Sequence, residues 1–363
     1  MSCSQRKEII YLESRETYFF SLQKTISTAI LVKVLGHTRK YKECILMNIK
    51  KSKVVIIGAG NVGVSTAFCL VNQGICDEIA LIDLNEEKVV GEVLDLTHCM
   101  EYMHRNVSVH AGTYDDCKDA NIIVITASAP MPKDKNDRLI MLDSSKKIMK
   151  SIVGSIMKTG FDGHLIVVSN PVDIMSYYAY KLSGLPANQV IGSGTTLDTA
   201  RLKCNIAKRI DVDPRSVNAL VIGEHGDSEM IPWSTITIGG KDIYSVVHDN
   251  EDRIGKHPYD EIKEATIKGG WEIFNRKGNT CYGIAASTVG IIKTILYNEN
   301  KILPVSTLLN GEYGETDLYI SVPTIMDRSG AKEIVELRLN EQEMTEFKAS
   351  CAHLRSFYKD LDI

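Results

Sequence analysis

The stretch that decides the fold is Val54-Val55-Ile56-Ile57-Gly58-Ala59-Gly60-Asn61-Val62-Gly63, which runs directly into the segment 64–73. The apolar residues Val54 to Ile57 predict a buried strand, and residues 64–73 predict a helix, so the three glycines lie in the turn between them. Gly58 permits a tight turn, Gly60 lets a ligand approach the backbone, and Gly63 lets helix and strand pack closely. Together with Asn61 and Val62 they place free N–H groups at a helix N-terminus, which favours a pyrophosphate there.

A carboxylate at the end of the next predicted strand indicates which dinucleotide binds. Asp83 follows Leu81-Ile82 and stands twenty residues after Gly63. At that distance a carboxylate can accept hydrogen bonds from both hydroxyls of the adenosine ribose, and it repels the extra phosphate of NADP. The sequence therefore predicts NAD as the cofactor.

The remaining chain repeats the alternation of short apolar runs and amphipathic helical segments. The other apolar runs are residues 79–82, 122–125 and 165–168, each unbroken, as is typical of parallel strands covered on both faces. Beyond Asn170-Pro171 the helical segments lengthen, a hairpin is expected around Gly239-Gly240, and a helix rich in Glu and Lys ends the chain. We predict an α/β protein, with a Rossmann-type doubly wound parallel sheet over residues 47–170 and an α+β catalytic (substrate) domain over residues 171–363.

Residues 1–46 stand apart as an N-terminal extension. They mix eight basic residues with four glutamates and lack the apolar core of a secretory signal, and the glutamates argue against a mitochondrial presequence. Lys42-Glu43 can be encoded as a ribosome-binding sequence upstream of Met47. We hypothesise that the segment arises from a start codon assigned too far upstream in a bacterial gene; the alternative is an arm that braces an oligomer.

Composition excludes several classes of partner. The chain has 363 residues, a net charge of −4 and no basic cluster with interleaved aromatics, so nucleic acid is not expected to bind. No apolar run reaches the ~18 residues of a membrane helix. The nine cysteines lack the paired short spacings that hold zinc, and their number and scatter suit a reducing compartment. We expect a cytoplasmic protein with small-molecule partners and no metal.

Two further segments supply candidate catalytic residues. The loop Gly223-Glu224-His225-Gly226-Asp227-Ser228 follows an apolar run, 219–222, that is expected to form a strand, and Asp198-Thr199-Ala200-Arg201 begins a predicted helix. A spacing of three places Asp198 and Arg201 on one helix face. Taken alone, His225 would be a solvated loop histidine and Asp198 a helix cap, so their function depends on the residues that accompany them.

These segments, with Ser169-Asn170-Pro171-Val172-Asp173 and the Arg138-Leu139 pair, resemble the L-lactate and malate dehydrogenase family, and within it the L-lactate dehydrogenases. The resemblance runs from Val54 to the C-terminus, with five separated motifs in the order of the family. It implies reversible hydride transfer between NADH and pyruvate, giving (S)-lactate and NAD⁺, a step of glycolytic fermentation. It also implies a homotetramer.

The chemistry of a 2-oxo acid explains the residue types. Arg201 can hold the carboxylate with two parallel hydrogen bonds, a planar match that lysine cannot make. Protonated His225 can donate to the carbonyl oxygen, and Asp198 can accept from the other ring nitrogen to fix its tautomer. Arg138, on a polar loop, is expected to polarise the carbonyl when the loop closes.

By resemblance, Asn170 lies beside the substrate carbonyl and the nicotinamide, and Thr280 lines the substrate pocket. The resemblance also implies that a group of residues at the strand ends contacts the cofactor: Thr126, Ala127, Ser128, Ser169 and Asn170.

The closing loop is where the chain departs from its family. Lactate dehydrogenases usually carry glutamine, and malate dehydrogenases arginine, at a position that Met131 occupies here, or Pro132 if the extra residue of the loop is placed before it. Without a cation the second carboxylate of oxaloacetate would be buried unpaired, which argues against malate, although Lys133 could reach in. A flexible apolar Met131 favours larger 2-oxo acids, so an L-2-hydroxyisocaproate-type enzyme is the alternative to lactate. A non-catalytic NAD-binding protein is a remote alternative, because the site residues are all present.

The family's activation by fructose 1,6-bisphosphate is expected to be weak or absent. The two positions that bind the bisphosphate in many bacterial relatives are Lys203 and Asn218 here. Lysine can still meet a phosphate, but asparagine brings no charge.

Overall fold

The computed structural model describes residues 51–128 and 142–361. Residues 1–46, Met131, Lys133 and Arg138 therefore lie outside the described residues. The rest of the predicted site lies within them.

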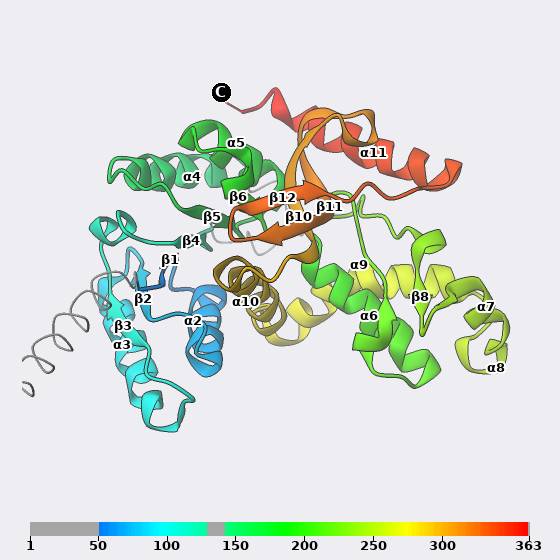
Figure 1. Cartoon of the computed structure of the whole chain (residues 1–363), viewed down its shortest axis with the longest axis horizontal. Coiled ribbons are helices and arrows are strands. Elements are labelled where there is room, and N and C mark those ends of the chain that lie inside the picture. Colours follow the sequence, from blue (N-terminus) through cyan, green and yellow to red (C-terminus); the bar gives the residue numbers. More distant parts are fainter. Residues whose placement is uncertain (1–50, 129–141, 362–363) are drawn as a thin grey trace, which may run out of the picture. The chain divides into compact units, whose positions relative to one another are not determined.

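One mixed sheet runs through the described chain (Figure 1). Its strand order is β12-β11-β10-β6-β5-β4-β1-β2-β3. The strands from β3 to β6 pair in parallel, and β10, β11 and β12 extend the sheet in antiparallel pairs. The strands are β1 Lys53–Ile57, β2 Glu78–Ile82, β3 Ser108–Ala111, β4 Ile122–Ile125, β5 His164–Val167, β6 Val190–Gly192, β10 Lys301–Asn310, β11 Thr316–Asp327 and β12 Gly330–Ile334.

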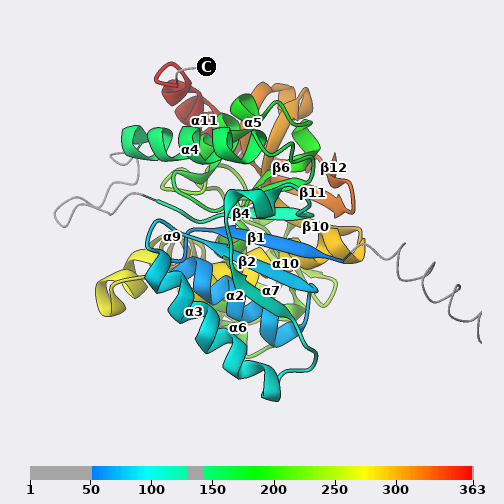
Figure 2. The ribbon, with the colours of Figure 1, turned by 90° about the vertical axis from the view of Figure 1, so that its left-hand side faces the viewer.

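Helices cover both faces of the parallel part, which confirms the predicted doubly wound arrangement. α4 and α5 lie on one face, and α2, α3 and α10 lie on the other (Figure 2). Successive residues of a strand point to opposite faces, so Val55 and Ile57 join the core beneath α4 and α5, whereas Val54 and Ile56 join the core beneath α2 and α10. Both faces exclude water, which is why the strand is apolar without alternation. The helices are α2 Asn61–Gln73, α3 Glu86–His98, α4 Leu142–Met157, α5 Val172–Ser183 and α10 Tyr282–Tyr297.

The order of the parallel strands reverses between β1 and β4. From β1 the chain continues outward to β2 and β3, and then crosses back to β4 on the other side of β1. Open α/β sheets bind ligands at such a reversal, at the carboxyl ends of the strands. The turn before α2 lies at this switch point.

The second half of the chain adds helices and a small sheet beside the large one (Figure 1). The expected hairpin is present: β8 (Thr237–Ile238) and β9 (Lys241–Asp242) pair across Gly239 and Gly240, both at positive φ. β8 also pairs with β7 (Val217–Asn218). The helices here are α6 Thr196–Ile210, α7 Ile243–His248, α8 Glu251–Ile254, α9 Pro258–Lys277 and α11 Glu341–Tyr358.

The sequence predictions about strands were wrong at one segment and left out several strands, β3, β10, β11 and β12 among them. The segment 219–222 is buried but forms only an isolated bridge, Ile222 with Met230. Side chains of α6 and its N-cap take the place of a neighbouring strand, because the backbone N–H of Val221 donates to Oγ1 of Thr199, and Oγ1 of Thr195 donates to the carbonyl of Val221. β3 was not predicted, since it lies at the sheet edge and is only half-buried.

The boundary expected near Pro171 stays a prediction. β6, which follows it in the chain, still pairs in parallel with β5 of the large sheet. No helix in residues 51–128 or 142–361 is long and apolar enough to cross a membrane.

Candidate active site

The turn after β1 has the geometry that its glycines predict. Gly58 has φ 109°, and its N–H donates to the carbonyl of Ile82 at 2.7 Å. A Cβ on Gly63 would collide with the carbonyl oxygen of Gly58 and lie 2.9 Å from Oγ1 of Thr126. The Thr126 hydroxyl itself donates to the Gly58 carbonyl at 2.8 Å. Thr126 thus holds the loop against the end of β4.

The N-terminus of α2 is open to a ligand. Gly60 is its N-cap and offers no side chain to the first N–H groups, and a Cβ built on Gly60 would meet nothing within 4 Å. Lys88 of α3 places its ammonium against the same loop, where it donates to the carbonyl of Ala59 at 2.6 Å. An uncapped helix N-terminus beside an ammonium group fits a pyrophosphate.

Asp83 is fixed at the end of β2 beside this loop. Its Oδ2 accepts from the N–H of Ala59 at 2.7 Å, and its Oδ1 accepts from the N–H of Asn85 at 3.0 Å. These bonds hold the half-buried carboxylate at the loop from which a ribose would extend. The arrangement fits the predicted role of Asp83 toward an adenosine ribose.

One carboxylate joins the two central catalytic candidates. Asp198 lies in the first turn of α6, and only 3% of its side chain is exposed. Its Oδ2 lies 2.5 Å from Nδ1 of His225, and its Oδ1 accepts from Nη1 of Arg201 at 2.5 Å. The predicted shared face of Asp198 and Arg201 is thus observed. Because Nδ1 is engaged by Asp198, a proton on Nε2 is the one that His225 can exchange with a substrate.

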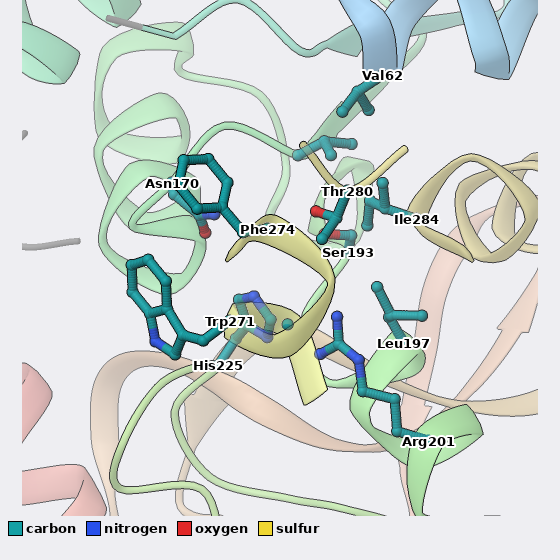
Figure 3. Close-up of a pocket in the computed structure, with 12 residues that line it drawn as sticks. Val62, Asn170, Ser193, Leu197, Arg201, His225, Trp271, Phe274, Thr280 and Ile284 are labelled. Carbon is teal, nitrogen blue, oxygen red and sulfur yellow. The ribbon is translucent and has the colours of Figure 1, made fainter. Parts of the chain in front are cut away.

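His225 and Arg201 line one pocket, and Figure 3 shows both turned toward the same space. Asn170 and Phe274 lie on one side of it and Thr280 on the other (Figure 3). The complete lining is Val62, Val168, Asn170, Ser193, Leu197, Arg201, His225, Gly270, Trp271, Phe274, Thr280 and Ile284. Val62 lies in the first turn of α2, so the N-terminus of this helix and the catalytic residues border one pocket.

The end of β5 delivers a polar group to this pocket. Oδ1 of Asn170 is buried and finds no hydrogen-bond partner among the described residues. A buried carbonyl oxygen without a donor is unfavourable unless a ligand supplies one. The neighbouring Ser169 hydroxyl donates inward, to the carbonyl of Ala127 at 2.5 Å, and so ties the ends of β4 and β5 together. Ala127 is half-buried and Ser128 is exposed at the end of the described segment.

Two aromatic side chains and a buried acid are among the residues that sequence reasoning missed at this site. Trp271 and Phe274 of α9 line the pocket with their rings 5.9 Å apart in an edge-to-face arrangement. Asp173, quoted only as part of a motif, is 1% exposed and accepts from the N–H of His225 at 2.7 Å. Burial raises the pKa of the Asp173 carboxyl to about 6, although the hydrogen bond from the N–H of His225 opposes the shift. The sequence did carry a signal for Asp173, because this acid stands among the apolar residues Val172, Ile174 and Met175 at the start of α5.

Comparison with known proteins identifies the family of the chain. Residues 52–192 match the family model for the lactate/malate dehydrogenase NAD binding domain, and residues 195–361 match that for the lactate/malate dehydrogenase alpha/beta C-terminal domain. The chain is 49% identical over 309 residues to L-lactate dehydrogenase 3 of Bacillus cereus, covering 85% of this chain and 98% of that protein. It is 45% identical over 316 residues to L-lactate dehydrogenase 1 of Bifidobacterium longum, covering 87% and 100%. Among solved structures, minor L-lactate dehydrogenase from Enterococcus mundtii in its ligands-bound form has a TM-score of 0.83 and 43% identity, covering 87% of this chain and 100% of that one.

Proposed function

The chain belongs to the lactate/malate dehydrogenase family and is an NAD-dependent 2-hydroxy acid dehydrogenase of the L-lactate dehydrogenase type, and we propose that His225, Asp198 and Arg201 carry out its chemistry. The observation that carries this proposal is the Asp198 carboxylate, which holds His225 through one oxygen and Arg201 through the other. The imidazole that donates a proton and the guanidinium that binds the substrate carboxylate are thereby fixed at one pocket.

We propose that the substrate lies between these two side chains. Arg201, held by Asp198, binds the carboxylate of the 2-oxo acid. Protonated His225 donates from Nε2 to the carbonyl oxygen as negative charge develops there, and takes the proton back in lactate oxidation. Asp198 stabilises the imidazolium, and its burial strengthens this effect because little water screens the pair. Bound NADH supplies the hydride.

Cofactor binding is assigned to the loop and strand ends described above. The N–H groups that follow Gly60 are available to the pyrophosphate, and Asp83 to the adenosine ribose. The orphan carbonyl of Asn170 suits a donor from the nicotinamide amide or from the substrate side of the pocket. Arg138 remains our choice for the group that polarises the substrate carbonyl, and its position is outside the described residues.

Pyruvate remains the preferred substrate over oxaloacetate. Among the described lining residues, Arg201 is the only arginine, and no lysine lines the pocket. One guanidinium pairs with one carboxylate, so a second carboxylate would be left without a cation in this part of the site. The apolar Trp271 and Phe274 favour larger 2-oxo acids as the alternative, in agreement with Met131.

A panel of 2-oxo acids tests this assignment. With NADH as cofactor, kcat/KM would be compared for pyruvate, oxaloacetate and 2-oxoisocaproate, and the configuration of the product would be determined. We expect the highest value for pyruvate and an S product. A higher value for 2-oxoisocaproate would replace lactate with the larger hydroxy acid, and the absence of turnover with all three would favour the non-catalytic alternative.

We also propose a cytoplasmic homotetramer. The described cysteines are free thiols, as suits a reducing compartment. Val90 and Leu94 of α3, 47% and 54% exposed, lie one turn apart and could contribute to a subunit interface. Light scattering coupled to size-exclusion chromatography would give the mass of the assembly.

A further inference from the structure

Asp173 is a buried acid that sits behind the loop of His225. It lies in the first turn of α5, and it is 1% exposed. Ionised carboxylates are seldom buried unless hydrogen bonds or charges compensate for the lost water. Its partners therefore indicate what it does.

The two oxygens of Asp173 have different partners. Oδ2 accepts from the backbone N–H of His225 at 2.7 Å. Oδ1 accepts from Oγ of Ser321 at 3.3 Å, and Ser321 pairs through its backbone with Gly223, at the start of the same loop. α5 and β11 thus hold the main chain of the loop, whereas Asp198 of α6 holds only the His225 ring.

We propose that Asp173 is a positioning residue that fixes the main chain of His225 and places a second negative charge behind the imidazole. The proposal rests on the proton-transfer role assigned to His225. Asp198 alone fixes the ring relative to α6, and a ring held only through Nδ1 could still shift with its backbone. The bond from the His225 N–H removes that freedom. The charge of Asp173 favours the protonated imidazole that pyruvate reduction requires.

Other charged and titratable groups surround this pair. Asp198 and Arg201 face His225 from α6, and Glu224 and Glu229 belong to the loop and its end. Tyr358 of α11 lies near enough for Asp173 to act on its ionisation. All of these remain in place when Asp173 alone is changed, so a change in the pH profile reports on Asp173.

Asp173→Asn separates charge from geometry, because the amide oxygen can still accept from the N–H of His225. As the pH is raised, kcat/KM for pyruvate should begin to decline at a lower pH in this variant than in the parent. We expect the midpoint to move down by about one unit, with a tenfold lower kcat/KM above both midpoints and a difference of less than threefold at low pH. Asp173→Ala also removes the acceptor, so it should lose at least tenfold in kcat at low pH.

The matched control is Asp317→Asn. Asp317 also bonds side chains of α5, through Tyr177 and Lys181, but lies at an exposed site and has no described bond to the loop. It has φ 50°, which asparagine tolerates. This control should keep the parent kcat, KM and pH profile, and NADH affinity should stay within twofold in all three variants.

A double variant distinguishes this proposal from the proposed function itself. In a His225→Asn background the effect of Asp173→Asn on the pH profile should disappear, because it acts through His225. If His225→Asn alone kept normal turnover, the proposed function would fail. If His225→Asn were inactive but Asp173→Asn kept the parent midpoint, or lost only thermal stability, Asp173 would be merely structural and the proposal overturned. If Asp173→Ala does not fold, the pH profile of Asp173→Asn still tests the proposal.

Discussion

Oδ2 of Asp198 lies 2.5 Å from Nδ1 of His225, and the other oxygen of the same carboxylate is bonded to Arg201. One buried acid therefore orients both the proton donor and the anchor of the substrate. The two functions are physically coupled, because a change in the carboxylate alters the imidazole and the guanidinium together. Changes at these three positions should accordingly be non-additive.

Asp198→Asn should lower kcat/KM for pyruvate by roughly 10²- to 10⁴-fold. The amide removes the charge that stabilises the imidazolium, and its NH₂ group can favour the wrong ring tautomer. Steady-state assays with NADH measure the loss, and NADH binding followed by fluorescence should remain normal. A loss of less than tenfold would show that His225 does not depend on this carboxylate.

Arg201→Lys should raise the KM for pyruvate by about a hundredfold, or ~3 kcal/mol. Lysine keeps the charge but cannot make two parallel hydrogen bonds to a carboxylate. Arg209→Lys is the matched control on the same helix, since Arg209 bonds the carbonyl of Ile254 and Glu261, away from the pocket. Equal effects of the two substitutions would contradict a specific role for Arg201.

Gly60→Ala and Gly63→Ala should separate cofactor binding from folding. A Cβ at Gly63 collides with the carbonyl of Gly58, so this variant should lose thermal stability. A Cβ at Gly60 meets nothing in the protein, so this variant should keep its Tm but bind NADH at least tenfold more weakly. Calorimetry and NADH titration measure the two effects. Unchanged NADH affinity in Gly60→Ala would contradict the assignment of the pyrophosphate to this loop.

Asp116 pairs with Lys53 and His110, and this ion-pair cluster should make the free energy of unfolding depend on pH in the acid range. Burial acts to raise the pKa of Asp116, but bonds from the Thr113 N–H, Lys53 and His110 outweigh it and lower the pKa from 3.8 to about 2. Because the folded-state pKa is depressed, this stabilisation is present above about pH 4 and is lost as the pH falls toward 2.

Asp116→Asn should therefore lower Tm at pH 7. The difference in Tm between this variant and the parent should become smaller as the pH falls from 4 to 2. Asp119→Asn is the control, because Asp119 also contacts Lys53 but its side chain is 69% exposed. Its effect on Tm should be small at every pH. A gap for Asp116→Asn that stays constant down to pH 2 would contradict the assignment.

Much of the fold could be predicted because its signals are local. The Val54 to Gly63 stretch encodes strand, turn and helix within one segment, and the unbroken apolar strands reflect a sheet covered on both faces. Edge strand β3 escaped prediction because none of its residues is fully buried, so it lacks an unbroken apolar run. The segment 219–222 was misassigned because an apolar run indicates burial and does not reveal whether another strand or the side chains of a helix satisfy its backbone.

The site was predictable where spacing along one helix carries the geometry, as for Asp198 and Arg201. The contact of Asp173 with His225 joins residues 52 positions apart, and only the folded chain brings them together. Trp271 and Phe274 looked like ordinary apolar residues of a helix, because helical spacing does not indicate which face meets a pocket.

Replacement of His225 tests the central claim most directly. Pyruvate reduction by NADH would be compared in the parent and in His225→Ala, with NADH affinity and Tm measured on the same samples. We predict a loss of about 3–5 kcal/mol in transition-state stabilisation, seen as a fall in kcat/KM of at least a hundredfold, with normal NADH binding and folding. Near-normal turnover in His225→Ala would contradict proton transfer by this residue.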